Sequence, residues 1–583
     1  MVVSAFRRTV IEAQEAMMAM RKRVEHGGTI RSRRDMLKAG VAGVVAATGV
    51  VRAAAAQAPA PRATRGSAAG VAGARLNGPL FFDVETTTGV VRGMANTGIK
   101  IFRGIPYGAD TSGANRFMPP RKPAAWTGAR NCLGYGPISP QTASGFRSDY
   151  AQLIQWDKHI GTGGMSEDCL SLNVWTPGVN DNAKRAVLVS FHGGGWATGS
   201  GNGPMYDGGQ LALLGDVVVV TVNHRLASFG YTHLAAVGAP TEFRSAAVCG
   251  VMDMVASLEW VRDNIAAFGG DPARVMIFGQ SGGGAKTSTL LGTPAAKGLF
   301  HRAVVQSGST LRLADEAAAE KSADMLLQKL GLTRRRVAEI QRLPWEQLLQ
   351  AQTEAAGAAF TPVMDGKYLP HHPFDPSAPA ESKDVPVIIS TTLEDAALRL
   401  TNWDLTESGL IALLNERYKD KASEILDLYR PVSGGKTPYL VQAQVFTDTQ
   451  VRSRAIAQAE RKAAQGGGGA WMYIWEWATP AFEGKLGAVH GHDVDASFNL
   501  YRNGICGTGE KTGRLMAKRL ASTFVAFAKT GNPDNDQIPH WPTYDAVTRA
   551  TMIFDANTRV VNDPRAAIRK YWSQNVESTA ADD

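Results

Sequence analysis

The chain has 583 residues, of which 44% are hydrophobic and 20% charged, a globular composition that excludes a largely disordered protein. Its length allows either several domains or one large α/β domain. The net charge is +9, but ten Lys or Arg against four Asp or Glu place +6 of it in residues 1–56, and the remaining charge is too scattered to indicate a nucleic-acid-binding surface.

The first 56 residues have the features of an export signal. Arg33 and Arg34 precede a moderately apolar run at residues 39–51, and small residues follow as far as Ala56. This order resembles a twin-arginine signal cleaved after Ala56, which predicts the twin-arginine export machinery as a partner and a periplasmic or secreted protein. A membrane anchor is the alternative, but the apolar run is shorter than the roughly 20 residues that a bilayer requires, so no permanent anchor is expected.

The rest of the chain shows one boundary near its start. Residues 57–78 are rich in Ala, Pro and Gly without periodicity and predict a flexible linker. No comparable boundary follows, so we expect one domain at residues 79–575 and a short tail at 576–583.

Short apolar runs with helix-like stretches between them recur along this domain. Continuous apolar runs are typical of strands whose two faces are both covered by helices, so the order predicts an α/β fold with a large, mostly parallel sheet. The stretch 251–269 predicts a helix between two of the runs, with Gly269 placed to end it. The runs are residues 186–191, 217–222, 274–278, 303–306, 385–389 and 471–475.

The sequence FHGGGW, residues 191–196, directly follows the first apolar run. Consecutive glycines can bring backbone N–H groups close to a developing negative charge without an intervening side chain. A tight turn without chemistry is the alternative. We predict Gly194 and Gly195 as donors of an oxyanion hole.

The stretch FGQSGGGAKT, residues 278–287, contains features of two motifs, a phosphate-binding loop and a nucleophile turn. A phosphate-binding loop requires its lysine directly after the second glycine, and here Ala285 intervenes between Gly284 and Lys286. The G-x-S-x-G pattern fits without adjustment, since a strand precedes Ser281 and a plausible helix follows it. This context predicts Ser281 as a nucleophile and the amide of Gly282 as a third oxyanion donor.

A general base for such a serine is expected late in the chain, where GAVHGHDVDASF contains His490 and His492. The alternative is a metal site that also includes Asp493 and Asp495. Two histidines two residues apart do not share a helix face, and no third ligand group is evident elsewhere. We therefore expect no metal and no cofactor.

Taken together, these and further stretches resemble the type B carboxylesterases, the family that includes the cholinesterases and the catalytically inert neuroligins. The matching stretches are FRGIPYG, NRFMPPRKPAAWTG, MSEDCLSLNVWTP, FHGGGW, VNHRLASFGY, WVRDNIAAFGGDPARVMIFGQSGGG, VVQSGS, GAVHG and WPTYD, over roughly residues 80–574. The resemblance implies an α/β-hydrolase fold with cap insertions, expected near residues 310–380 and 400–450. It also implies that His490, which begins the H-G dipeptide, is the catalytic histidine.

The triad's acid is expected after the strand VPVIIS, in TTLEDAA. Counting along the family's pattern places it at Asp395, with Glu394 as the alternative because the family usually uses glutamate. Either carboxylate can orient the imidazole and stabilise the imidazolium, so chemistry does not separate them. Asp493 occupies the place of a supporting acid.

Some positions depart from the family's pattern. Gly282 stands where alanine is usual. Ser139 replaces the usual disulfide partner of Cys169, so that bridge is expected only if Cys132 substitutes, and the sequence leaves the pairing of Cys249 and Cys506 open. The tryptophan typical of cholinesterases is missing at His159, so choline esters are not indicated.

The resemblance predicts a serine hydrolase that cleaves small-molecule or lipophilic carboxylic esters through an acyl-enzyme. An acyltransferase or amidase with the same triad is one alternative. A non-catalytic binding protein on the same fold is another, and it predicts the loss of a triad member, whereas this chain keeps a serine, a histidine and candidate acids.

Overall fold

The computed structural model describes residues 79–142, 163–501 and 510–575. The predicted export signal, linker and tail, together with His159 and Cys506, lie outside these ranges. The strands are β1 (Phe81–Thr86), β2 (Gly89–Asn96), β3 (Ile99–Pro106), β4 (Ala129–Asn131), β5 (Ser171–Thr176), β6 (Arg185–Phe191), β7 (Val218–Val222), β8 (Gly270–Gln280), β9 (Arg302–Gln306), β10 (Val387–Thr392), β11 (Ala470–Trp475), β12 (Ala550–Phe554) and β13 (Arg559–Asn562). The α-helices are α4 (Gly209–Gly215), α5 (Ala227–Tyr231), α6 (Cys249–Asn264), α7 (Gly282–Leu291), α8 (Glu316–Lys329), α9 (Trp345–Glu354), α10 (Glu407–Tyr418), α11 (Ala422–Tyr429), α12 (Pro438–Thr447), α13 (Ser453–Gln465), α14 (His492–Ser497), α15 (Lys511–Thr530) and α16 (Ala566–Asn575).

The described strands form one sheet in the order β1-β2-β3-β5-β7-β6-β8-β9-β10-β11-β12-β13, and β4 pairs with β2. The run from β7 through β6 to β12 is parallel. The pairs β1–β2, β2–β3, β3–β5, β5–β7 and β12–β13 are antiparallel, whereas β4 pairs parallel with β2. The sheet is thus mostly parallel at its centre, as predicted, and antiparallel toward both edges.

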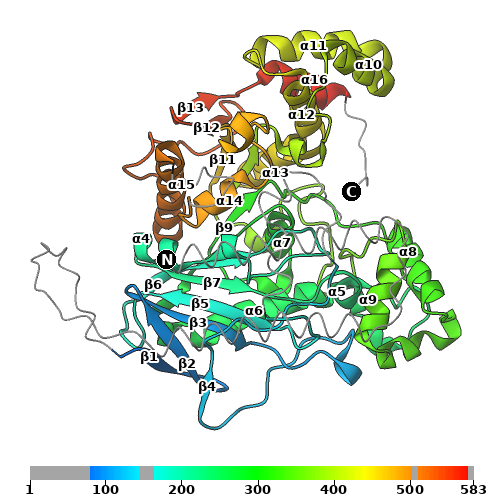
Figure 1. Ribbon diagram of the computed structural model, residues 1–583, viewed down its shortest axis with the longest axis vertical. Helices are drawn as coiled ribbons and strands as arrows, with labels where there is room; N and C mark the ends of the chain where they lie inside the picture. Colours follow the sequence, from blue (N-terminus) through cyan, green and yellow to red (C-terminus); the bar gives the residue numbers. More distant parts are fainter. Residues whose placement is uncertain (1–78, 143–162, 502–509, 576–583) are drawn as a thin grey trace, which may run out of the picture. The chain divides into compact units, whose positions relative to one another are not determined.

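Both faces of the central strands are buried, which explains why their sequences read as continuous apolar runs. In β6, Val187 and Val189 join one hydrophobic core, and the intervening Leu188 joins another. Helices α6, α7 and α13 contribute to the first core, and α4 and α15 cover the opposite face. Figure 1 shows α4 and α15 on one side of the strands and α6 on the other.

The six apolar runs correspond to β6, β7, β8, β9, β10 and β11, so the sequence placed the central strands correctly. The helix predicted at residues 251–269 is α6, which starts at Cys249 and passes at Ile265 into a short 3₁₀ helix. Gly269 follows with φ 75°, the left-handed conformation that glycine adopts without strain.

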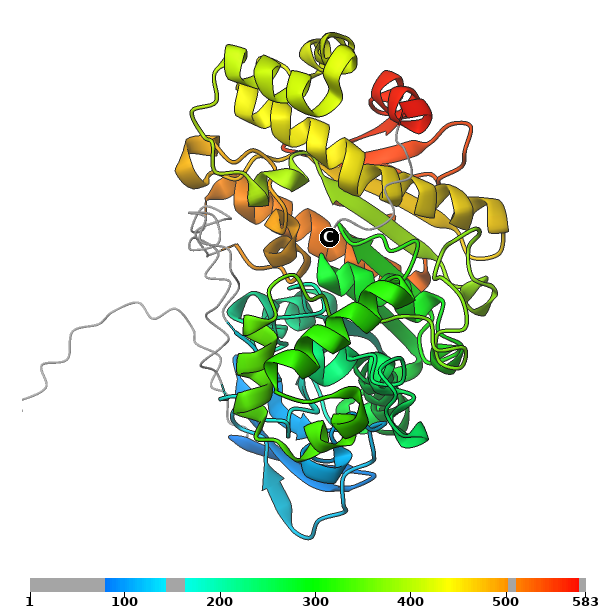
Figure 2. The same cartoon turned by 90° about the vertical axis from the view of Figure 1, so that its right-hand side faces the viewer.

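The C-terminal half of the sheet carries a separate helical group. Helices α10, α11, α12 and α16 share a small hydrophobic core of their own and cluster at the top of Figure 1. The helix α12, a π-helical turn (Asp448–Arg452) and α13 form one continuous helical run. This run, yellow to gold in Figure 2, lies against β10.

Three of the four cysteines lie in described residues, and Cys132, Cys169 and Cys249 are all buried free thiols. The substitute bridge between Cys132 and Cys169 therefore does not form. Burial raises the pKa of Cys132 to about 11 and that of Cys249 to about 12, so both are protonated and unreactive at neutral pH. No helix in residues 79–142, 163–501 or 510–575 has the length and apolar character needed to cross a bilayer.

Candidate active site

Ser281 lies in the sharp turn between β8 and α7, at the carboxyl end of the parallel sheet. Its φ of 59° and ψ of −125° are sparsely populated by non-glycine residues, so the turn holds the serine under strain. The turn requires glycine around it, because a Cβ on Gly283 would lie 2.1 Å from the carbonyl oxygen of Phe191, the last residue of β6. The end of β6 thus lies directly against the turn, and the glycine-rich loop follows from it.

The predicted oxyanion glycines meet the same turn. Gly194 and Gly195 have φ of 91° and 60°, conformations that a side chain would strain. A Cβ on Gly282 would lie only 2.4 Å from the amide nitrogen of Gly195. The backbones of the two segments therefore touch, and the structure brings the amides of Gly195 and Gly282 into one small region beside Ser281.

His490 lies on the loop before α14, and its Nδ1 hydrogen-bonds directly to Asp395 Oδ1. The second oxygen of Asp395 accepts hydrogen bonds from Ser307 Oγ (2.6 Å) and the amide of Thr392 (3.0 Å). Burial raises the pKa of this carboxyl, but the charge of His490 and these hydrogen bonds outweigh burial and lower the pKa below its ordinary value. Asp395 is therefore ionised at neutral pH and favours a proton on Nδ1, which leaves Nε2 able to accept one.

Glu394, the alternative acid, points into a different set of contacts. Its Oε1 accepts hydrogen bonds from Lys436 and from Gln444 Nε2 (2.7 Å), and its Oε2 accepts one from the amide of Ala488 (2.8 Å). Ala488 lies two residues before His490, so Glu394 holds the histidine loop in place and does not bond the imidazole.

Two residues that the sequence did not single out contact the histidine and the acid. Gln280 contacts His490, and Ser307 contacts Asp395. The Gln280 side-chain amide nitrogen lies 3.1 Å from His490 Nε2. Ser307 has φ 46°, and the stretch VVQSGS that contains it was visible only as a family motif.

The remaining predicted site residues serve the structure around His490. Asp493 is buried and accepts hydrogen bonds from Gln306 Nε2 (2.9 Å) and Tyr473 OH (2.8 Å). Burial raises the pKa of Asp493. His492 is fully buried, accepts a hydrogen bond from Trp475 Nε1 (3.1 Å) and stacks on Trp477, so its surroundings are those of a core histidine. The described residues contain no group of three His, Cys, Asp or Glu side chains arranged to hold a metal ion.

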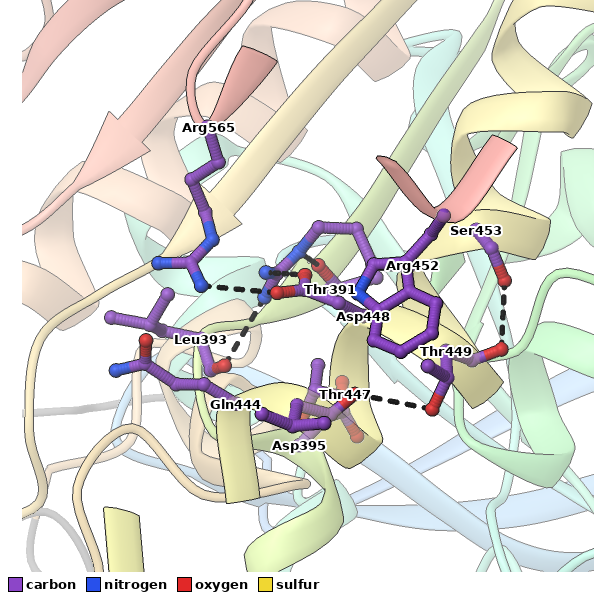
Figure 3. Close-up of polar contacts among 12 residues, drawn as sticks. Thr391, Leu393, Asp395, Gln444, Thr447, Asp448, Thr449, Arg452, Ser453 and Arg565 are labelled. Carbon is purple, nitrogen blue, oxygen red and sulfur yellow. Dashed lines mark hydrogen bonds and ion pairs between the residues drawn. The ribbon is translucent and has the colours of Figure 1, made fainter. Parts of the chain in front are cut away.

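A buried charge network supports the turn that carries Asp395. Arg452, on the π-helical turn, donates to the carbonyl oxygens of Thr392 (2.8 Å) and Leu393 (3.2 Å) and forms an ion pair with Asp448. Arg565 donates to the same carboxylate at 3.0 Å, and Figure 3 shows both guanidinium groups converging on Asp448. These contacts fix the end of β10, directly before Asp395.

Comparisons with known proteins show the family of this chain. The chain matches the model of the carboxylesterase family over residues 82–572. It is 32% identical over 504 residues to para-nitrobenzyl esterase of Bacillus subtilis, covering 84% of this chain and 97% of that protein. It is 32% identical to phenmedipham hydrolase of Pseudarthrobacter oxydans, covering 82% and 96%. The crystal structure of a carboxylesterase from Geobacillus stearothermophilus superposes with a TM-score of 0.73 at 32% identity, covering 84% of this chain and 99% of that one.

Proposed function

The chain belongs to the carboxylesterase family and is a carboxylic ester hydrolase with the α/β-hydrolase fold, and from this premise we propose that it works through an acyl-enzyme. Ser281 is the nucleophile, His490 the general base and Asp395 the acid that orients the imidazole. The hydrogen bond between His490 Nδ1 and Asp395, next to a serine held at φ 59°, is the observation that carries this proposal.

The reaction proceeds in two matched halves. Ser281 Oγ attacks the ester carbonyl carbon while its proton passes to His490 Nε2, and the imidazolium is stabilised by Asp395. The carbonyl oxygen becomes an oxyanion. Collapse of this intermediate breaks the bond to the alkoxide, which leaves with the proton from Nε2. Water then gives a proton to the same nitrogen and attacks the acyl carbon. Collapse of this second oxyanion breaks the bond to Ser281 Oγ, which takes back the proton from Nε2 as the acid is released.

The oxyanion is held by the backbone N–H groups of Gly194, Gly195 and Gly282. Loss of one such donor typically lowers kcat about 10²- to 10³-fold. The proximity of the Gly195 and Gly282 backbones supports the assignment, because both amides must reach one oxygen atom.

The nucleophile is tested with para-nitrophenyl esters of graded acyl length and with a para-nitrobenzyl ester, the substrate class in the name of the Bacillus relative. Ser281→Ala should abolish turnover of every ester without changing the thermal unfolding temperature by more than a few degrees. Turnover in the variant equal to that of the wild type would exclude Ser281. Product analysis with an added alcohol or amine measures any acyl transfer or amide chemistry beside hydrolysis.

We also propose that residues 1–56 direct export through the twin-arginine machinery, which the paired arginines and the short apolar run support. Replacing both Arg33 and Arg34 by lysine should block export, so that the esterase activity stays in the cytoplasm. Activity is measured in separated periplasmic and cytoplasmic fractions, and an unchanged distribution would contradict the proposal.

A further inference from the structure

Lys286 is a buried lysine close to the proposed active site, and the proposed mechanism gives it no role. It lies on α7, five residues after Ser281, and its side chain is inaccessible to solvent. Its Nζ donates a hydrogen bond of 2.8 Å to the carbonyl oxygen of His192 and lies 5.9 Å from the centre of the Trp196 ring. His192 and Trp196 flank the three glycines of the predicted oxyanion loop, so one amine contacts both ends of that loop.

This placement is costly, because burial of an ammonium group without a carboxylate is unfavourable. Within the described residues Lys286 has no ion-pair partner, and burial alone lowers its pKa to about 7. The pKa of His224 is lowered mainly by burial and next by the charge of Lys286. The rings of His224 and His192 stack with their centres 5.0 Å apart. A methionine would fill the same volume without this cost, so the contact with His192 requires an explanation beyond packing.

The glycine loop also makes hydrogen bonds to other parts of the fold. The amide of Gly193 donates to Tyr206 OH (2.9 Å), and the carbonyl oxygen of Trp196 accepts from the amide of Ala227 (2.8 Å). Neither contact reaches α7. Lys286 therefore provides a side-chain tether between the loop with the amides of Gly194 and Gly195 and the helix whose first residue is Gly282.

We propose that Lys286 is a positioning residue that holds the His192–Trp196 loop against α7, so that the oxyanion donors of the loop and of the helix converge on one point. The proposal rests on the function proposed above. Lys286 touches no reacting atom. Lys286 should stabilise the transition state, in which the donors must reach the oxyanion. It should have little effect on the binding of the ester.

The test compares Lys286→Met with a matched control, Lys462→Met. Lys462, on α13, is also buried and donates to two backbone carbonyls, those of Ser382 (2.8 Å) and Lys383 (2.6 Å), before the start of β10. The readouts are kcat and KM for a para-nitrophenyl ester and the inhibition constant of an aryl trifluoromethyl ketone, which adds to a serine to form an oxyanion.

For Lys286→Met we expect kcat to fall about tenfold or more with KM within about threefold, and ketone affinity to fall by a similar factor. Lys462→Met should change the unfolding temperature but neither kcat nor ketone affinity. Lys286→Gln, which keeps an N–H donor, should recover part of the loss in kcat.

The inference is overturned if folded Lys286→Met keeps kcat within threefold, or if kcat falls while ketone affinity does not. Should the methionine variant not fold, Lys286→Leu, which also lacks an N–H donor, decides by the same changes in kcat and ketone affinity, and normal values of both overturn the inference. Failure of the proposed function gives a different result, since Ser281→Ala would then keep turnover and ketone binding.

Discussion

Gly282 occupies the position where the family's pattern has alanine, and the structure predicts that alanine is harmful here. A Cβ at this residue would lie 2.3 Å from the carbonyl oxygen and 2.4 Å from the amide nitrogen of Gly195, whereas ordinary contact begins at 3.4 Å. All the atoms it meets are backbone, so no flexible side chain can rotate away. The glycine loop must therefore retreat by about 1 Å from α7.

The expected result of Gly282→Ala is a loss of kcat without a loss of fold. Alanine suits a helix better than glycine by up to about 1 kcal/mol, which partly offsets the strain on the loop. A displacement of about 1 Å between reacting groups costs about 10²-fold in rate. We therefore expect kcat to fall about 10²-fold with KM within a few fold, because the oxyanion exists only along the reaction.

The assay is steady-state hydrolysis of a para-nitrophenyl ester beside thermal unfolding of the same preparations. Gly134→Ala is the matched control, since a Cβ there meets no atom within 4 Å and both measurements should match the wild type. If Gly282→Ala keeps kcat within threefold of the wild type, either the loop retreats without consequence or Gly195 does not bind the oxyanion. Both results would refute the reasoning.

Three further predictions test other contacts. Asp395→Asn should lower kcat about 10⁴-fold, whereas Glu394→Gln should mainly lower the unfolding temperature; a greater kcat loss at Glu394 would reverse the assignment. The pKa of Lys286 falls from 10.5 to about 7 on folding, so the unfolded chain binds more protons between these values and native stability gains up to about 1.4 kcal/mol per pH unit as pH rises. Urea unfolding at pH 7 and 9 should show this slope in the wild type and its loss in Lys286→Met. Asp448→Asn leaves Arg452 without its ion-pair carboxylate and should cost about 3–5 kcal/mol in the same assay, and a cost under 1 kcal/mol would contradict the role of the network.

Much of the fold was predictable because local patterns carry it. The central strands are apolar throughout because helices cover both faces of the sheet. Single segments such as residues 186–191 and 471–475 can therefore be recognised as buried strands from their own sequence. The turn at Ser281 was predictable from its glycines, because the backbone of Phe191 leaves no space for a side chain at Gly283 and the sequence must therefore have glycine there. The strands β1, β2 and β4 at one end of the sheet were not predicted, because partly exposed strands have no such continuous apolar run.

The sequence by itself predicted the six central strands β6 to β11, the helix α6 and the family, together with the serine, histidine and glycines of the family's motifs. Only the tertiary structure separated Asp395 from Glu394: two adjacent carboxylates are chemically equivalent, and the direction of each side chain decides which one meets His490. The contacts of Gln280 with His490 and of Lys286 with His192 join residues 210 and 94 positions apart. Such contacts leave no local pattern, because they depend on how distant segments pack and on where each side chain points.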